Sequence, residues 1–275
     1  LIKFLKKQKK TFLVAPMKYG VISGGKKIRS TIIFDTGKLL KIKEKSLIDI
    51  CAAVECIHSY SLIHDDLPCM DNDKIRRGKP STHIKFGEAS AVLAGSSLLT
   101  LAFEIIAEKK YILNSKMKNE IIQFLASCSG HTGIAGGQEL DLKFENKKMQ
   151  INQIIDMQKK KTGKLFNFCL YAVGVIANKT VKEKKYLSNL GEEIGLLFQL
   201  ADDFLDKKGS KHLLGKPVKK DNKKGKSTLL NLMGEKKAYL YANNLKKKIL
   251  LKLKKHGKKA KELSSTIKFI LERKF

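Results

Sequence analysis

The sequence lacks the features that mark secreted, membrane-spanning or disulfide-rich proteins. Its five cysteines are an odd number and form no Cys-x-x-Cys pair, which argues against a disulfide framework and favours reduced thiols in a cytoplasm. The longest apolar stretch, 91–107, is interrupted by glycine, serine, threonine and glutamate, so it falls short of the roughly 20 apolar residues of a membrane span. The opening segment has no apolar core or small-residue cleavage site of a signal peptide. We expect a cytoplasmic protein without a transmembrane segment, and, because residue 1 is a leucine within an amphipathic pattern, we expect the native N-terminus to be missing.

Acidic residues are also scarce, with 26 Asp and Glu against 56 Lys and Arg, which gives a formal charge of +30. Such a charge is typical of proteins that bind nucleic acid or anionic membranes. The lysines are spread along the whole chain, however, with few of the interleaved arginines and aromatics that read bases. We interpret most of them as solvated helix faces and expect no nucleic-acid partner, and the stretch 246–261 is the best candidate for any function of surface charge.

Strand signals are equally few, which predicts an all-α fold. No repeat period of 20–50 residues is evident, so a helical solenoid is excluded. No linker divides the chain, and we expect residues 1–275 to form a single domain, one large helical bundle around a central cavity. The expected helices cover 1–12, 28–41, 46–66, 88–108, 116–129, 151–177, 181–205, 227–253 and 258–273. Turn-forming residues separate them at 23–25, 68–73, 77–81, 133–137 and 207–217.

One acidic cluster lies in the segment 195–206, which reads GLLFQLADDFLD. A step of 100° per residue places Gly195, Gln199, Asp202 and Asp206 within one 60° arc. Apolar residues flank this narrow polar stripe on nearly every other side, which inverts the pattern of a surface helix. We therefore expect Asp202 and Asp206 to face an internal cavity.

A second acidic cluster ends the largely apolar segment 51–71. His58, Ser61 and Asp65 share a 60° arc of the expected helix, whereas Asp71 is six residues further on and about 120° away. Pro68 lies between the two aspartates and disrupts the helical hydrogen bonds. A bend or bulge at this point is required before Asp65 and Asp71 can share a metal ion.

The two clusters together indicate a metal site. Two carboxylates about one turn apart repel each other by roughly 3 kcal/mol at about 5 Å in an effective dielectric near 20, so a cation is expected between them. Oxygen ligands favour a hard ion such as Mg²⁺, which usually also binds waters and substrate phosphate oxygens. A solvated helix face is the ordinary explanation of one acidic pair, but two clusters on apolar helices favour one metal-lined cavity.

These residues resemble the trans-prenyltransferase (polyprenyl synthetase) family in its bacterial farnesyl diphosphate synthase form. The resemblance covers essentially the whole chain, and its specificity comes from the order of the motifs. They are GGKKIR (24–29), ECIHSYSLIHDD (55–66), DDLPCMD (65–71) with RRG (76–78), GQELDL (137–142), KTGKL (161–165), GLLFQLADDFLD (195–206) and GKPVKKDNKKGKSTL (215–229).

The resemblance implies an isoprenoid synthase fold, a homodimer and a condensation of two isoprenoid diphosphates. The allylic diphosphate ionises, the double bond of isopentenyl diphosphate attacks the cation, and the departing diphosphate takes the proton. Three Mg²⁺ ions are implied per active site, two bound by Asp65 and Asp71 with Asp66 in support, and the third by Asp202 with Asp206. The implied contacts of the allylic diphosphate are Arg76, Lys161, Thr162, Gln199, Lys216 and Lys226, and those of isopentenyl diphosphate are Lys26, Arg29, His58 and Arg77. Catalysis is thereby assigned to Asp65, Asp66, Asp71, Arg76, Lys161, Asp202 and Lys216.

The resemblance also bears on product length. Tyr60 and Ser61 precede the first aspartate by about one turn, where the family builds the floor of its chain-elongation tunnel, and they resemble the farnesyl-producing type. Helical geometry places Ser61 on the aspartate stripe but Tyr60 about 140° away from it. We expect a C15 product, formed through geranyl diphosphate from dimethylallyl diphosphate.

Two substitutions depart from the family pattern at the first motif. Lys27 stands where arginine is usual, and Ser30 stands where proline is usual. Lys27 keeps the charge but not the bidentate fork, and the start of the following helix can shift, which affects the assignment of Arg29.

Several alternatives stay open. A geranylgeranyl (C20) synthase or a terpene cyclase would share the fold, although a cyclase normally lacks the second aspartate motif found here. A non-catalytic helical subunit could lose one aspartate cluster, but both are intact. A basic nucleic-acid-binding protein would leave both acidic clusters unexplained.

Overall fold

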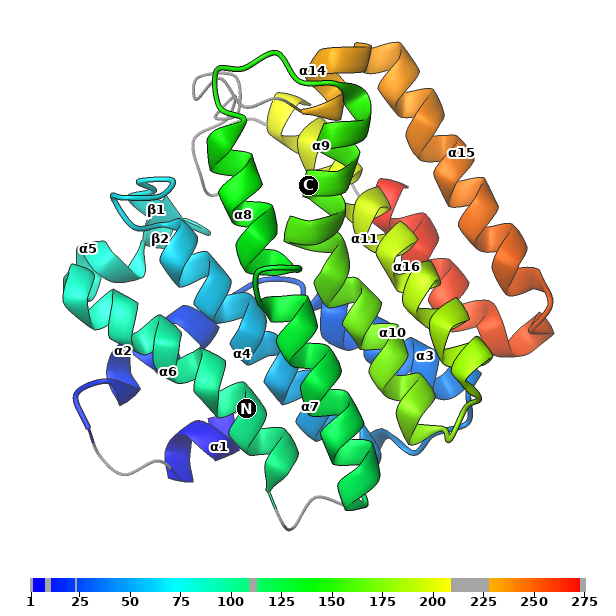
Figure 1. The fold of residues 1–275 in the computed structure, drawn as a ribbon, viewed down its shortest axis with the longest axis horizontal. Helices are drawn as coiled ribbons and strands as arrows, with labels where there is room; N and C mark the ends of the chain where they lie inside the picture. Colours follow the sequence, from blue (N-terminus) through cyan, green and yellow to red (C-terminus); the bar gives the residue numbers. More distant parts are fainter. Residues whose placement is uncertain (1, 8–10, 23, 109–112, 209–227, 273–275) are drawn as a thin grey trace.

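The structure, a computed structural model, describes residues 2–7, 11–22, 24–108, 113–208 and 228–272 (Figure 1). Its elements in chain order are α1 (Ile2–Lys7), α2 (Val14–Ile22), α3 (Ile28–Leu39), η1 (Glu44–Ser46), α4 (Ile48–Asp65), β1 (Ile75–Arg76), β2 (Lys79–Pro80), α5 (Thr82–Phe86), α6 (Glu88–Ala107), α7 (Ser115–Ser129), α8 (Ile134–Lys143), α9 (Ile151–Gln158), η2 (Lys159–Gly163), α10 (Lys164–Ile176), α11 (Val181–Lys208), α14 (Leu229–Met233), α15 (Glu235–Lys254), η3 (Gly257–Ala260) and α16 (Lys261–Glu272).

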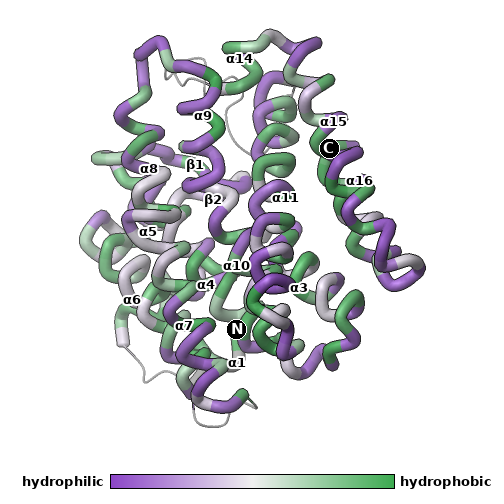
Figure 2. The backbone as a smooth tube through the Cα atoms, turned by 45° about the vertical axis from the view of Figure 1, so that its right-hand side comes forward, coloured by the Kyte–Doolittle hydropathy of each residue, from purple (hydrophilic) through white to green (hydrophobic). Residues whose placement is uncertain are grey.

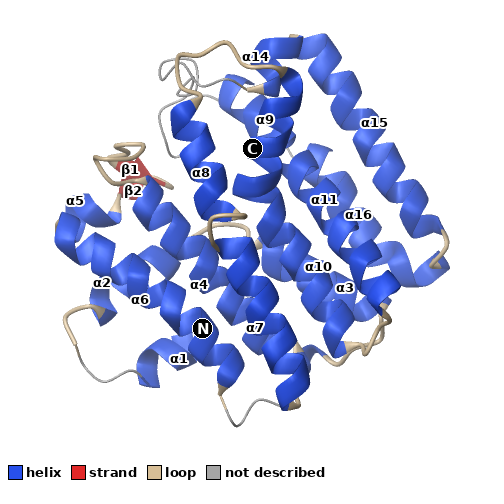
Figure 3. Ribbon diagram, viewed as in Figure 1, coloured by secondary structure: helices blue, strands red, loops and turns tan. Residues whose placement is uncertain are grey.

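The predicted all-α class is confirmed, since helices make up nearly all of the regular structure in the described ranges (Figure 3). The one exception there is an antiparallel hairpin in which Ile75 pairs with Pro80 and Arg76 pairs with Lys79. Arg77 and Gly78 connect the strands with positive φ values of 52° and 74°. Positive φ at both central residues defines a type I′ turn, which matches the twist of paired strands.

Some expected boundaries were wrong. The segment 133–137 was predicted as a turn because it contains three glycines, but Ile134 begins α8 and Gly136 and Gly137 lie inside that helix. Helices α2 and α5 were not predicted, and of the helix expected over 1–12 the described residues are helical over Ile2–Lys7 but not at 11 and 12. The helix expected over 227–253 is divided at Gly234, whose φ of 75° stops α14 before α15 begins.

The centre of the bundle is built by α4, α10 and α11, whose packing brings distant parts of the chain together. Helix α10 packs along α11, α7 and α3, while α4 packs along α6. Phe166 and Phe168 of α10 are fully buried, because the residues of this helix are apolar around most of its circumference. Outer helices such as α15 and α16 instead mix hydrophilic and hydrophobic residues along their length (Figure 2).

Helix α6 contains the long apolar stretch of the sequence. By length and composition alone it could cross a membrane, contrary to the expectation from its interruptions, but buried helices of soluble proteins share these properties. Ala91, Ala94, Leu98 and Ala102 are buried on the face that meets the bundle. The interpretation of this stretch as a packed helix therefore holds for that face. All five cysteines are free, and Cys69 alone among them is exposed.

Candidate functional site

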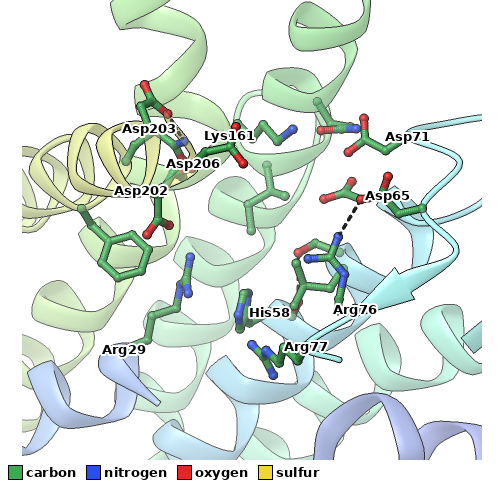
Figure 4. Close-up of a pocket in the computed structure, with 18 residues that line it drawn as sticks. Arg29, His58, Asp65, Asp71, Arg76, Arg77, Lys161, Asp202, Asp203 and Asp206 are labelled. Atoms are coloured by element: carbon green, nitrogen blue, oxygen red, sulfur yellow. Dashed lines mark hydrogen bonds and ion pairs between the residues drawn. The ribbon is translucent and has the colours of Figure 1, made fainter. Parts of the chain in front are cut away.

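The first aspartate cluster lies where α4 ends. Asp65 is the last residue of this helix, and the backbone N–H of Asp71 donates to the carbonyl of Asp65 at 2.8 Å. The chain turns back through Pro68 instead of continuing as a helix, so Asp65 and Asp71 line the same pocket (Figure 4). The predicted interruption between the two aspartates is confirmed.

The pocket has a volume of about 320 Å³ and collects charged side chains from six segments of the chain. Figure 4 shows two groups of aspartates that face each other across the pocket, with Lys161 above and the arginines below. We call them the first bank, Asp65 and Asp71, and the second bank, Asp202, Asp203 and Asp206. The lining residues are Arg29, His58, Ser61, Leu62, Asp65, Asp71, Asp73, Arg76, Arg77, Ile134, Gln138, Lys161, Thr162, Phe198, Gln199, Asp202, Asp203 and Asp206.

The electrostatics of the first bank favour a bound cation. Burial raises the pKa of Asp65 to about 6, and the nearby carboxylate of Asp71 adds to the rise while Lys161 opposes it. Within the described ranges, no three carboxylate, histidine or cysteine side chains already form a closed cluster of metal ligands. The carboxylates are divided between two walls, which is the arrangement expected when a ligand completes the coordination of a hard ion. Mg²⁺ is usually bound in this way, by a few carboxylates together with waters and substrate phosphates.

Asp66 has a different position from its neighbour. It is only 2% exposed, does not line the pocket and receives hydrogen bonds from the guanidinium of Arg76, with Nε 2.8 Å from both carboxylate oxygens and Nη2 2.5 Å from Oδ1. Although burial lowers the pKa of Arg76, these bonds raise it above its ordinary value. Asp66 therefore fixes Arg76 against the pocket, a supporting position rather than that of a direct metal ligand.

The second bank is held by a network of amides on α11 and its neighbours. The Gln199 amide Nε2 donates to Asp203 Oδ1 at 2.9 Å, and its Oε1 accepts from the hydroxyl of Thr162 at 2.8 Å. Gln158 Nε2 donates to the other oxygen of Asp203 at 3.1 Å. The predicted polar stripe of Gln199, Asp202 and Asp206 does line the pocket.

Sequence reasoning was wrong about two residues of α11. Asp203 lines the pocket although helical geometry places it about 100° from Asp202, and its position within the same acidic motif was the available signal. Gly195 was predicted to share the polar stripe but serves packing instead, since a Cβ atom there would lie 2.6 Å from Gly163 Cα.

Lys161 is placed by an irregular turn. Residues Lys159–Gly163 form a π-helix between α9 and α10, an insertion that is frequent at functional sites because it redirects one side chain. The ε-amino group of Lys161 lies 2.6 Å from Asp141 Oδ2 on α8. Asp141 was noted only as part of a motif and was not expected to position this lysine.

Gly137 permits the close approach that supports Lys161. A Cβ atom at Gly137 would lie 2.1 Å from the backbone nitrogen of Lys161, so backbone must move if any other residue stands there. We expect Gly137→Ala to lower the free energy of unfolding by about 2 kcal/mol, because overpacking of about 3 kcal/mol outweighs a helix-propensity gain of about 1 kcal/mol. Urea unfolding measures the change. Glu139→Ala on the same helix is the control, and equal stability of the two variants would contradict this role of Gly137.

Arg29 enters the pocket from the first turn of α3, beside two aromatic rings that contact each other. Its guanidinium carbon lies 4.8 Å from the ring centre of Phe166 and 5.7 Å from that of Phe198. Burial lowers the pKa of Arg29, while Glu55 and Asp202 oppose that effect. Contact with the rings restricts the movement of this planar cation. Its buried Nε has no hydrogen-bond acceptor among the described residues, so an incoming anion could supply one.

His58 and Arg77 complete the cationic wall. Burial lowers the pKa of His58 well below its ordinary value, and the positive charges of Arg29 and Arg77 lower it further, so the imidazole is neutral near pH 7. Arg77 lies in the hairpin turn, where its Nη1 donates to the carbonyl of Gly24. This bond ties the hairpin to the glycine segment before α3.

The remaining predicted residues have different positions. The ε-amino group of Lys26 lies 5.4 Å from the ring centre of Phe269, outside the pocket. Ser61 lines the pocket, whereas the buried Tyr60 donates from its hydroxyl to the Ser129 carbonyl at 3.3 Å, which agrees with the helical geometry. Lys216 and Lys226 fall outside the described residues.

The bundle and its pocket together define a class of protein. It is an all-α protein in which carboxylates on two facing helices and fixed cations converge on one central pocket. The chain belongs to the polyprenyl synthetase family, whose sequence model matches residues 10–269.

Individual relatives agree with this assignment. The chain is 41% identical over 237 residues to the farnesyl diphosphate synthase of Escherichia coli strain K12, which covers 86% of this chain and 79% of that protein. An FPP/GFPP synthase from Zymomonas mobilis superposes with a TM-score of 0.87 at 37% identity, over 98% of this chain and 94% of the other. A geranyltransferase from Helicobacter pylori, solved with magnesium and isoprenyl diphosphate, superposes with a TM-score of 0.85 at 32% identity, over 98% and 92% of the two chains.

Proposed function

We propose that this protein is a short-chain prenyl diphosphate synthase that condenses isopentenyl diphosphate with dimethylallyl and then geranyl diphosphate to form farnesyl diphosphate. The observation that carries the proposal is the division of the pocket, with two banks of aspartates above and a wall of arginines below. The reaction needs this division. One diphosphate must become a leaving group, whereas the other must stay intact.

The aspartate banks suit the diphosphate that departs. Asp65 and Asp71 on one wall and Asp202 and Asp206 on the other would hold Mg²⁺, three ions per site by analogy with the family. When bound, Mg²⁺ would neutralise the charge that accumulates on the leaving oxygen. Asp66 would orient Arg76 toward the same diphosphate. Lys161, Thr162, Gln199, Lys216 and Lys226 would add contacts, the last two from outside the described residues.

The arginine wall suits the diphosphate that is retained. Arg29 and Arg77 supply fixed guanidinium forks, which bind phosphate oxygens in bidentate geometry, and the neutral His58 donates or accepts a single hydrogen bond. Lys26 would have to leave Phe269 to take part, and its contribution stays a prediction.

The apolar part of the pocket protects the reaction. Leu62, Ile134 and Phe198 also line it, and their apolar side chains would help to shield an allylic cation formed there from water. The new carbon–carbon bond forms between this cation and the double bond of isopentenyl diphosphate, and a proton then leaves to the departing diphosphate. No side-chain base is required.

Product length depends on Tyr60 in this proposal. Tyr60 is a buried residue of α4 next to Ser61, which lines the pocket, and its hydroxyl donates to the carbonyl of Ser129 at the end of α7. We expect Tyr60→Ala to deepen the tunnel and to shift the main product from C15 to C20 or longer, as measured by product chromatography. Tyr60→Phe, which removes only the bond to Ser129, is the matched control and should retain C15. A C20 main product from the unaltered protein would favour the alternative of a geranylgeranyl diphosphate synthase.

We also propose a homodimer that works in the cytoplasm as one domain over 1–275. Helix α6 supports the dimer, because Val92 and Leu93 are 42% and 54% exposed on its outer face. Sedimentation equilibrium should give about twice the chain mass of 30.9 kDa. A monomer at micromolar concentration would contradict this part of the proposal.

A further inference from the structure

A second pocket lies at the opposite end of α11 from the aspartates. Along the helix, Leu187 is 15 residues from Asp202, a distance of roughly 22 Å. The volume of this second pocket is about 450 Å³, within the range of small-molecule sites. In Figure 1 the segments that form it lie at the lower right of the bundle, where α3 ends, α11 begins and α15 turns into η3. The lining residues are Leu39, Leu40, Lys41, Lys179, Glu183, Tyr186, Leu187, Lys255, His256 and Lys259.

Positive charge dominates this pocket. Four lysines from three segments of the chain line it, against the single carboxylate of Glu183. Glu183 is already bound by Lys179 at 3.0 Å and by the backbone N–H of Thr180 at 2.9 Å. The charge of Lys255 lies 3.7 Å from the ring centre of Tyr186.

Neutralisation of helix ends is the competing explanation for these lysines. The C-terminal ends of α3, α10 and α15 meet here, each worth about half a negative charge, and the N-terminal end of α11 contributes about half a positive charge. Four lysines against one glutamate and these helix ends leave an excess of about two positive charges. Helix dipoles therefore do not account for the whole cluster.

His256 provides an independent observation. Its Nε2 is buried and has no hydrogen-bond partner among the described residues, although buried polar atoms are normally paired. Burial and the positive charges of Lys255, Lys179 and Lys259 lower its pKa. A neutral imidazole beside these lysines is a group with which a bound anion would pair, and the anion would favour uptake of a proton from solvent by the ring.

The geometry points to a binding site for a phosphate group in this second pocket, carried on a small molecule with an apolar body. A phosphate monoester bears about −1.5 to −2 charge at pH 7, which matches the excess positive charge of the cluster. Leu39, Leu40 and Leu187 form an apolar wall beside the lysines, which suits an organic substituent rather than a bare ion. The pocket is separate from the aspartate site, so this site does not depend on the proposed enzymatic activity.

Histidine NMR tests the proposal directly. The ring resonances of His256, assigned by their loss in His256→Gln, are followed while phenyl phosphate or inorganic phosphate is added to the full chain at constant ionic strength. We expect saturable shifts and a rise in the pKa of His256. Tighter binding of phenyl phosphate than of inorganic phosphate would show that the pocket also binds the apolar part of the ligand. Equal affinity would contradict the apolar part of the proposal and indicate a site for the free phosphate ion.

Two neighbouring lysines allow binding at a specific site to be distinguished from attraction to the general positive charge of the surface. Lys259 lines the pocket, whereas Lys258 is exposed beside it and does not. Lys259→Ala should weaken binding roughly tenfold, because a charge-assisted hydrogen bond is lost, while Lys258→Ala should leave it unchanged. Thermal unfolding of both variants checks that each is folded. The proposal would be overturned if the His256 shifts increased linearly with ligand concentration without saturating, or if chloride produced the same shifts. It would also be overturned if Lys258→Ala and Lys259→Ala weakened binding equally.

Discussion

Replacing Asp65 by asparagine should reduce the turnover number at least about a thousandfold under saturating substrates and Mg²⁺. The substitution keeps the size of the side chain but removes the charge that Asp65 and Asp71 present together at the end of α4. Loss of the metal contribution to charge stabilisation is worth several kcal/mol in the transition state, and about 1.4 kcal/mol corresponds to each factor of ten. Steady-state kinetics with isopentenyl and dimethylallyl diphosphates measures the effect.

Asp49→Asn is the matched control for this variant. It makes the same change near the beginning of the same helix, about 24 Å along the axis from Asp65. We expect it to leave turnover within about twofold, with only a small loss of stability from the helix dipole. If Asp65→Asn kept its helical circular dichroism and turned over within tenfold of the unaltered protein, the metal site would not be where we place it.

The second large effect concerns Arg29. We expect Arg29→Gln to raise the KM for isopentenyl diphosphate by roughly 30-fold or more, because a bidentate charge-assisted contact worth about 2 kcal/mol is removed. The KM for dimethylallyl diphosphate should change less than about threefold, since the aspartate banks hold that substrate. Measurement of both KM values in one variant tests the division of the pocket into two halves.

Lys38→Gln provides the control for the loss of a cation from α3, because Lys38 is exposed near the other end of that helix. Arg29→Lys adds a sharper comparison. Lysine keeps the charge but neither the fork nor the planar contact with the rings of Phe166 and Phe198, so we expect it to recover only part of the affinity. Equal increases of both KM values in Arg29→Gln would contradict the assignment of this arginine to one diphosphate.

The two departures from the family pattern are explained by one buried acid. Glu55 of α4 is 6% exposed and accepts a hydrogen bond from the hydroxyl of Ser30 at 2.8 Å, while Lys27 forms an ion pair with it at 3.0 Å. Lys27 has a φ of 49° immediately before α3, and the helix begins at Ile28, so Arg29 keeps its place in the first turn. With these two substitutions present, the structure places Arg29 in the lining of the pocket.

Helical periodicity predicted most, although not all, of the pocket residues on α11 and the end of α4, since it missed Asp203. The stripe of Gln199, Asp202 and Asp206 follows from 100° per residue, and the required break after Asp65 follows from the six-residue spacing across Pro68. The pairing of Asp66 with Arg76 could not be predicted in this way, because it depends on a hairpin whose turn conformation has no periodic signal.

Glycine misled the prediction at α8. Glycines normally mark turns, but Gly136 and Gly137 are helical here, and Gly137 is required by the backbone of Lys161, which is distant in sequence. The π-helix at Lys159–Gly163 was likewise not predicted, because the segment 151–177 was interpreted as one regular helix. Both features depend on packing between segments that periodicity treats separately.

Turnover with and without a chelator tests the central claim most directly. The full chain is incubated with isopentenyl and dimethylallyl diphosphates, first with Mg²⁺, then with excess EDTA, and then with Mg²⁺ restored, and the products are separated by chromatography. We predict a C15 diphosphate that forms with Mg²⁺, stops with EDTA and resumes when Mg²⁺ is restored. Condensation that continues at full rate in EDTA, or no condensation under any of the three conditions, would contradict the account.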